Sequence, residues 1–154
     1  MHDPFKITQP TCISFSGGRT SAYMLWRVLQ TNGGMPADTV VCFANTGKEV
    51  EATLRFVRDC AEHWQVPIRW LEYVPMEPGF ALIDFDRASR QGEPFEALIR
   101  KRQYLPNPVA RGCTSYGERD IVNSACPMSN CHPRAAANAI GLRPYGRRRR
   151  GSVN

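Results

Sequence analysis

The strongest constraint on the fold is the alternation of β-rich runs with amphipathic helices in the first half of the chain. The run 11–15, TCISF, is rich in β-forming residues and ends at a Ser-Gly-Gly turn, which is typical of a buried parallel strand. Similar runs occur at 38–44 and 67–73. Between the runs, apolar residues recur every three or four positions, which predicts one helix beginning near Thr20 and another over 50–64.

This alternation predicts an α/β fold with a Rossmann-like parallel sheet and helices on both faces, because consecutive parallel strands need right-handed crossover connections. The TNGG segment at 31–34 is expected to end the first helix, and Pro67 the second. Further along the chain, an additional strand is expected within 81–89, followed by a short helix at 93–102 with Pro94 in its first turn.

From about residue 116 no clear periodicity remains, so the C-terminal tail is poorly specified. We therefore divide the chain into a domain, 1–115, and a divergent or partly disordered basic tail, 116–154. The net charge of the chain is +6, and four of its positive charges are consecutive: Arg147, Arg148, Arg149 and Arg150. Such a run is a candidate contact for nucleic acid, and the alternative is a solvated terminus.

The sequence contains no apolar run near the roughly 20 residues that span a bilayer. Its first ten residues, MHDPFKITQP, are too polar and too acidic for a signal peptide. We therefore expect a cytoplasmic protein without membrane contact. In that reducing compartment the six cysteines would be mostly thiols, some of them small buried apolar residues.

The loop after the first predicted strand combines two glycines, three hydroxyl side chains and a cation: Ser16, Gly17, Gly18, Arg19, Thr20 and Ser21. Ligands of parallel sheets bind at the carboxyl ends of the strands, where helix N-termini offer N–H groups to anions. Glycines allow the main chain to approach a phosphate closely. The position of this loop is equally compatible with a simple turn in which Ser16 caps the helix. The loop matches neither the P-loop motif G-x4-G-K-[ST] nor the dinucleotide-binding motif G-x-G-x-x-G, and neither motif occurs elsewhere in the sequence.

Four stretches, in chain order, resemble the PP-loop nucleotide-binding superfamily. SFSGGRTS at 14–21 is similar to its pyrophosphate loop. FANTGKEVEATLRFV at 43–57, GEPFEALI at 92–99 and NPVARGCTS at 107–115 resemble segments of one branch, the phosphoadenosine phosphosulfate (PAPS) reductase family. The resemblance implies an adenine nucleotide alpha-hydrolase-like fold, with ATP or PAPS as the ligand, Mg²⁺ as a candidate cofactor, and a role in sulfur metabolism.

The resemblance also implies roles for particular residues. Phosphates would lie at Ser16–Ser21, and a second loop would close over the nucleotide with Asn45, Thr46 and Gly47. The sulfate or phosphate end would meet Thr114 and the two catalytic candidates, Arg111 and Cys113. The reaction would be reduction of a sulfonucleotide by a thiol reductant protein, as in an oxidoreductase, or adenylation with release of pyrophosphate, as in an ATP pyrophosphatase-type transferase.

The sequence departs from the family pattern at several places, two of which bear directly on the chemistry. Arg19-Thr20 stands where the family usually has Lys-Asp, so a carboxylate that could help to hold Mg²⁺ is missing. The family's C-terminal cysteine motif is also missing, and Cys131-His132 is the nearest candidate. These departures favour an alternative, a non-catalytic or truncated nucleotide-binding module. In that case the segment after Ser115 would be a truncated or frame-shifted version of the family's longer C-terminal part.

The remaining chemistry-bearing residues have simpler interpretations. The set Cys113, Cys126, Cys131 and His132 lacks the tight C-x2-C spacing of zinc sites, so we predict no metal centre. Glu49 and Glu51 are expected to complement the dipole of the second helix, or else to contact Mg²⁺ or ribose indirectly. Asp84 and Asp86 are expected on an exposed strand edge, and the two tryptophans Trp64 and Trp70 in the core.

Overall fold

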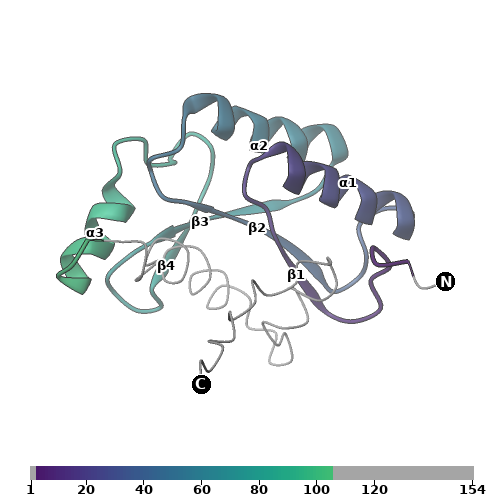
Figure 1. Ribbon diagram of the computed structural model, residues 1–154, viewed down its shortest axis with the longest axis horizontal. Helices are drawn as coiled ribbons and strands as arrows, with labels where there is room; N and C mark the ends of the chain where they lie inside the picture. Colours follow the sequence, from purple (N-terminus) through teal and green to yellow (C-terminus); the bar gives the residue numbers. More distant parts are fainter. Residues whose placement is uncertain (1–2, 106–154) are drawn as a thin grey trace, which may run out of the picture.

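The computed structural model describes residues 3–105 of the chain. Its centre is a four-stranded sheet in the order β1-β2-β3-β4, built from Thr11–Ser14, Thr39–Asn45, Ile68–Tyr73 and Phe80–Ile83 (Figure 1). The first three strands are parallel, and β4 pairs with β3 in the antiparallel sense. The α/β class and the parallel strands expected from the sequence are therefore confirmed.

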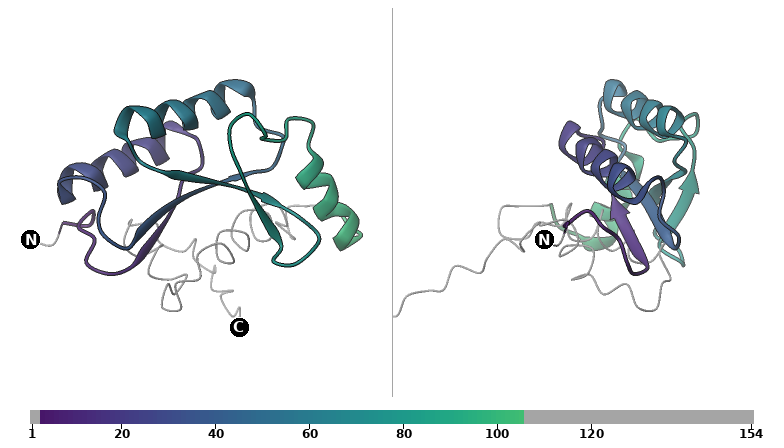
Figure 2. Two further views of the ribbon diagram at one scale, coloured as in Figure 1. Left: turned by 180° about the vertical axis from the view of Figure 1, so that it is seen from behind. Right: turned by 90° about the vertical axis from the view of Figure 1, so that its right-hand side faces the viewer.

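Two helices, α1 (Arg19–Asn32) and α2 (Glu51–Trp64), lie side by side on one face of this sheet (Figures 1 and 2). They share a face because β1, β2 and β3 follow one another in one direction across the sheet, and successive right-handed crossovers then fall on the same side. The third helix, α3 (Glu93–Arg102), packs beside β3, where Lys101 Nζ lies 5.9 Å from the centre of the Tyr73 ring.

The helix boundaries follow from local sequence signals. The helix α1 ends at Gly33, whose φ of 71° is left-handed and whose N–H donates to the last turn, as the TNGG segment predicted. The helix α2 ends earlier than Pro67 requires, because Gln65 already adopts a left-handed φ of 52°. Helix α3 has the predicted bounds, with Pro94 in its first turn.

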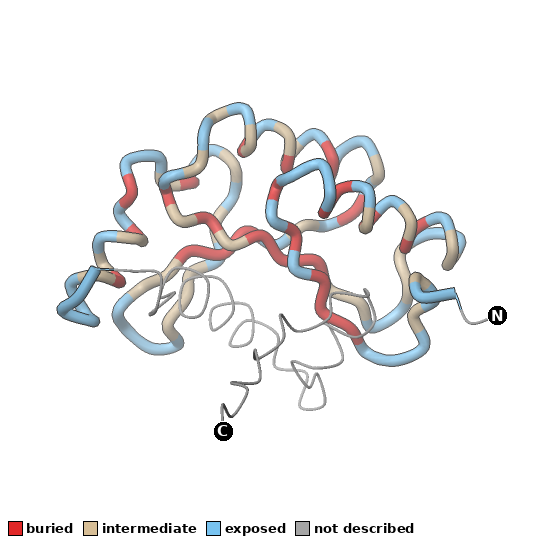
Figure 3. The backbone as a smooth tube through the Cα atoms, in the orientation of Figure 1, coloured by how far each residue is buried: buried red, intermediate tan, exposed pale blue. Residues whose placement is uncertain are grey.

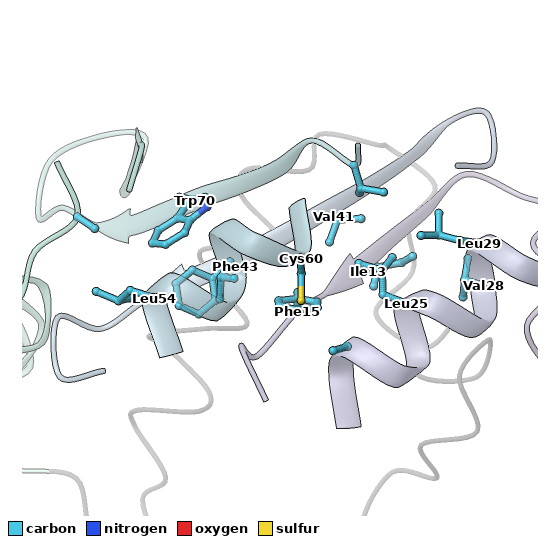
Figure 4. Close-up of a cluster of buried hydrophobic side chains, with 14 residues drawn as sticks. Ile13, Phe15, Leu25, Val28, Leu29, Val41, Phe43, Leu54, Cys60 and Trp70 are labelled. Carbon is cyan, nitrogen blue, oxygen red and sulfur yellow. The ribbon is translucent and has the colours of Figure 1, made fainter. Parts of the chain in front are cut away.

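The main core lies between the sheet and the helices α1 and α2 (Figures 3 and 4). Apolar side chains at alternate positions of the strands meet one stripe of each helix: Ile13, Val41 and Phe43 from the strands, Phe15 just after β1, and Leu25, Val28, Leu54 and Val57 from the helices. Trp70 is buried in this core and Trp64 packs against it, as predicted. Each fully buried leucine contributes roughly 1.5–3 kcal/mol relative to exposure, so this layer holds the strand ends in place.

The opposite face of the sheet carries a smaller cluster made of Cys12, Cys42 and Leu71. The Sγ atoms of Cys12 and Cys42 are 4.0 Å apart. Within residues 3–105 the three cysteines, these two and Cys60, are buried thiols, as expected, and burial raises the pKa of the Cys60 thiol. None of the helices between residues 3 and 105 combines the length and the apolar character that a bilayer crossing requires.

The prediction for the two aspartates is wrong. Strand β4 ends at Ile83, and Asp84 begins a turn in which its Oδ1 accepts the N–H of Arg87 at 2.8 Å. Asp86 lies within the same turn. The alternation of apolar residues continued past the strand because Phe85 packs from the turn against Trp70, with ring centres 6.0 Å apart.

The first turn of α2 receives no hydrogen bond from the side chain of its N-cap residue, so a better cap should stabilise the helix. Its cap residue Val50 has extended dihedral angles, is 68% exposed and makes no side-chain hydrogen bond to the first turn. In Val50→Ser a hydroxyl would accept an N–H of that turn, so we expect the free energy of unfolding to rise by about 0.5–2 kcal/mol in urea denaturation. Ala52→Ser is the control, since it adds the same hydroxyl inside the helix. Equal stability of Val50→Ser and the wild type would show that the first turn gains nothing from a cap.

Candidate functional site

The loop between β1 and α1 is held against the neighbouring helix at Gly17. This residue has a left-handed φ of 75°, which favours glycine. A Cβ atom at Gly17 would lie 2.7 Å from Thr53 Cγ2 and 3.3 Å from the ring of Phe43. Gly17 is therefore required both by its conformation and by its close contact with α2 and β2, and it fixes where the loop runs.

The N-terminus of α1 has no side-chain cap among the described residues. The cap position is Gly18, and the first turn contains no acidic residue. Ser16, which the sequence offered as a cap, instead donates from Oγ to Ser21 Oγ at 3.1 Å, and Ser21 Oγ donates to Gly18 O at 2.9 Å. No side chain within residues 3–105 therefore accepts the N–H groups at the start of α1, which form the positive end of the helix dipole. Arg19 and Thr20 are exposed beside them.

The loop after β2 forms the neighbouring part of the same sheet edge. Asn45, only 2% exposed, ends β2, and its Oδ1 accepts the N–H of Gly47 at 3.1 Å. Gly47 has a φ of 76°, and a Cβ atom there would lie 2.9 Å from Gly92 Cα. Lys48 Nζ donates to Gln91 O at 3.1 Å. The loop 45–48 is thus packed against the segment before α3.

A buried polar cluster joins these segments, and the sequence reasoning missed two of its members. Glu72, 7% exposed, stands opposite Asn45 in the β2–β3 register. Its Oε1 accepts Asn45 Nδ2 at 2.6 Å and Ser89 N at 2.7 Å, and its Oε2 accepts Ser89 Oγ at 2.8 Å. Asn45 Nδ2 also donates to Ser89 O at 3.0 Å. The available signal was a carboxylate within the apolar run WLEY, at the carboxyl end of a parallel strand.

The two glutamates after β2 have structural partners. Glu51 begins α2, and its carboxylate lies 2.7 Å from Arg90 Nε and 3.5 Å from Arg55 Nε. The hydrogen bond from Arg90 holds the pKa of Glu51 below its ordinary value. Glu49 accepts a hydrogen bond from Thr46 Oγ1 at 3.3 Å. The place of Glu51 in the first turn of α2 fits the helix-dipole role expected for it, and its ion pairs with Arg90 and Arg55 were not predicted.

Two groups of predicted site residues lie outside the described part of the chain. One is the sulfate or phosphate end, made of Arg111, Cys113 and Thr114. The other contains the tail residues with candidate chemistry: Cys126, Cys131, His132, Arg147, Arg148, Arg149 and Arg150. Between residues 3 and 105 no group of three or more His, Cys, Asp or Glu side chains is arranged to hold a metal ion.

Comparison with known proteins shows that part of the chain is similar in sequence to a phage protein. The uncharacterized nin region protein ORF290 of Escherichia phage lambda is 42% identical to it over 60 residues. The aligned stretch is 39% of this chain and 20% of that protein, so the chain spans about a fifth of the length of this curated relative. No family model matches the chain, and no solved structure matches it. The function is therefore argued from the geometry of the sheet edge.

Proposed function

We propose that the chain binds an adenine nucleotide in the manner of the PP-loop superfamily, with the phosphates on the β1–α1 loop. One observation carries the proposal: α1 begins at the carboxyl edge of the parallel strands with no side-chain cap and no acidic residue in its first turn. Open α/β sheets bind ligands at this edge, and a helix N-terminus attracts anions. The resemblance of 14–21 to a pyrophosphate loop favours phosphate as the anion.

The residues of the loop fit a phosphate chain. The N–H groups of the first turn would donate to phosphate oxygens, and the exposed guanidinium of Arg19 would add a charge-assisted hydrogen bond. The hydroxyls of Ser16 and Ser21 already bond to each other, so both are positioned at the start of the helix. On the neighbouring loop, Thr46 and Gly47 stand at the same edge, while the Asn45 side chain is used within the protein.

The proposed chemistry takes place at the α-phosphate or phosphosulfate of the nucleotide, in ATP or PAPS. Reduction of a sulfonucleotide would release sulfite and oxidise two thiols to a disulfide, one from Cys113 and one from a thiol reductant protein. Adenylation would instead release pyrophosphate with Mg²⁺ as the counter-ion. Arg111 and Thr114 would bind the reacting anion. In either case the protein would act in the cytoplasm.

A second candidate is a nucleotide-binding module without turnover, with a basic tail on nucleic acid. The observation that favours it is the absence of a carboxylate from the first turn of α1, since Thr20 stands where a Mg²⁺ ligand would be expected. Pyrophosphate release from ATP in the presence of Mg²⁺ supports adenylation. Nucleotide binding without turnover supports the module.

The test is a thermal-shift panel with ATP, PAPS and adenosine 5′-phosphosulfate on the full chain. A ligand that binds only the folded state at 100 times its Kd stabilises it by about 2.7 kcal/mol. We expect one of the three to raise the Tm, and Ser16→Ala to reduce the shift because a hydroxyl beside the phosphates is lost. Thr31→Ala is the matched control, because it removes a hydroxyl from the last turn of α1, at the opposite end of the helix from the loop. No shift with any of the three nucleotides would refute the proposal.

A further inference from the structure

The buried carboxylate of Glu72 is the least expected group in the described part of the chain. None of the ion pairs among residues 3–105 includes it, and its partners are three neutral donors supplied by Asn45 and Ser89. Burial of a carboxylate is costly unless hydrogen bonds satisfy it, and here both oxygens are satisfied. The cluster therefore forms only when β2, β3 and the segment containing Ser89 are in place together.

The hydrogen bonds of this cluster orient the loop 45–48. Asn45 uses its Nδ2 group on Glu72 and Ser89, and this leaves Oδ1 directed at the N–H of Gly47. That bond supports the left-handed turn at Gly47. The Asn45 side chain therefore links Glu72 to the loop that follows β2, through one hydrogen bond to each.

The same carboxylate fixes the segment 89–92. It accepts both the N–H and the hydroxyl of Ser89, which starts this segment. Farther along, the segment meets the first loop directly, because Gly92 packs on Gly47 and Gln91 O accepts Lys48 Nζ. The loops 45–48 and 89–92, which are more than 40 residues apart in sequence, therefore pack against each other beside the Glu72 carboxylate.

We propose that Glu72 is a positioning residue, which locks the loops 45–48 and 89–92 into one rigid wall of the nucleotide site. The proposal rests on the proposed function for the identity of the ligand. Glu72 acts through Asn45 and Ser89 and does not touch the nucleotide. Its effect is on the placement of Thr46, Gly47 and the ammonium group of Lys48.

Two substitutions separate hydrogen-bond geometry from charge. In Glu72→Gln the amide oxygen accepts from Asn45 Nδ2 and Ser89 N, while the amide nitrogen donates to the Ser89 hydroxyl, which is free to rotate. This variant keeps the cluster without its charge. Glu72→Met has a similar length and no hydrogen-bonding capacity of this kind, so the donors of Asn45 and Ser89 lose their acceptor.

The experiment measures loop order and nucleotide affinity separately in the full chain. Amide hydrogen exchange of Gly47 and Ser89, taken relative to the core amide of Val41, reports the loops whether or not a nucleotide binds. In Glu72→Met we expect this exchange to be at least about tenfold faster and nucleotide affinity at least about tenfold weaker. In Glu72→Gln we expect both within about threefold of the wild type.

Leu29→Ala controls for stability, since Leu29 is a core residue near the far end of α1. It should lower the Tm without changing affinity or the relative exchange of the loop amides. The positioning role would be overturned if the relative exchange of the Gly47 and Ser89 amides were unchanged in Glu72→Met. It would also be overturned if Glu72→Gln and Glu72→Met changed amide exchange and nucleotide affinity equally. A wild type that binds none of the nucleotides refutes the proposed function alone, because the exchange measurement still decides whether Glu72 locks the loops.

Discussion

Replacement of Gly18 by aspartate is expected to raise the Tm of the ligand-free protein and, at the same time, to abolish nucleotide binding. Gly18 has φ −97° and ψ 164°, the extended conformation of a helix N-cap, and the nearest atom to an added Cβ is Ser16 Oγ at 3.7 Å. Aspartate fits there and is among the best N-cap residues, so the gain in unfolding free energy over glycine is about a few tenths of a kcal/mol.

The loss of binding in Gly18→Asp has an electrostatic cause. The carboxylate would accept the N–H groups that the phosphates need, and its charge would lie beside theirs. Two like charges about 4 Å apart repel by about 4 kcal/mol near a protein surface, so nucleotide affinity should fall at least about a hundredfold in titration calorimetry.

The matched control is Gly18→Asn, which caps the helix about as well and carries no charge. We expect it to raise the Tm to a similar extent while losing much less affinity than the aspartate variant. Wild-type affinity in Gly18→Asp would mean that the phosphates do not lie at the start of α1.

The second large effect is expected at Gly17. In Gly17→Ala the new methyl group would lie 2.7 Å from Thr53 Cγ2, on a residue whose φ of 75° is unfavourable for alanine. The left-handed conformation costs about 1–2 kcal/mol and overpacking about 1–3 kcal/mol, so we expect the free energy of unfolding to fall by about 2–5 kcal/mol in urea denaturation.

Gly33→Ala separates the two causes. Gly33 has a similar φ of 71°, but no atom lies within 4 Å of an added Cβ, so only the conformational cost applies. In addition, Thr53→Ser removes the methyl group nearest to the new side chain and should recover part of the loss in the double variant. Equal destabilisation of Gly17→Ala and Gly33→Ala would show that the loop does not pack tightly against α2.

The sequence predicts most of the fold, because its signals are local. Helix α3 begins and ends where the run EPFEALIRKR does, and α1 ends at its glycine pair. The antiparallel pairing of β4 was not predicted, since alternation shows which face a side chain takes and not which strand lies beside it. The predicted helix 50–64 ends at Trp64 as α2 does, because its apolar periodicity stops there, although the left-handed Gln65 carries no strong sequence signal of its own.

The candidate site shows the same division between local and long-range information. The loops 16–21 and 45–47 could be predicted from motifs that are contiguous in the sequence. Their connection to Ser89 through Glu72 could not, because the hydrogen bonds join residues 17 and 44 positions apart. Whether the exposed Arg19 replaces the usual lysine remains a prediction that the binding experiments test.

The common direction of α1 and α2 bears on the stability of the fold. Both helices follow parallel strands, so they run side by side with their N-termini at the same edge of the sheet (Figure 1). Each terminus carries about half of a positive charge, and like ends of neighbouring dipoles repel. An anion between them converts this repulsion into attraction. A nucleotide bound at this edge as proposed would therefore stabilise the fold by reducing the repulsion between the two helix ends.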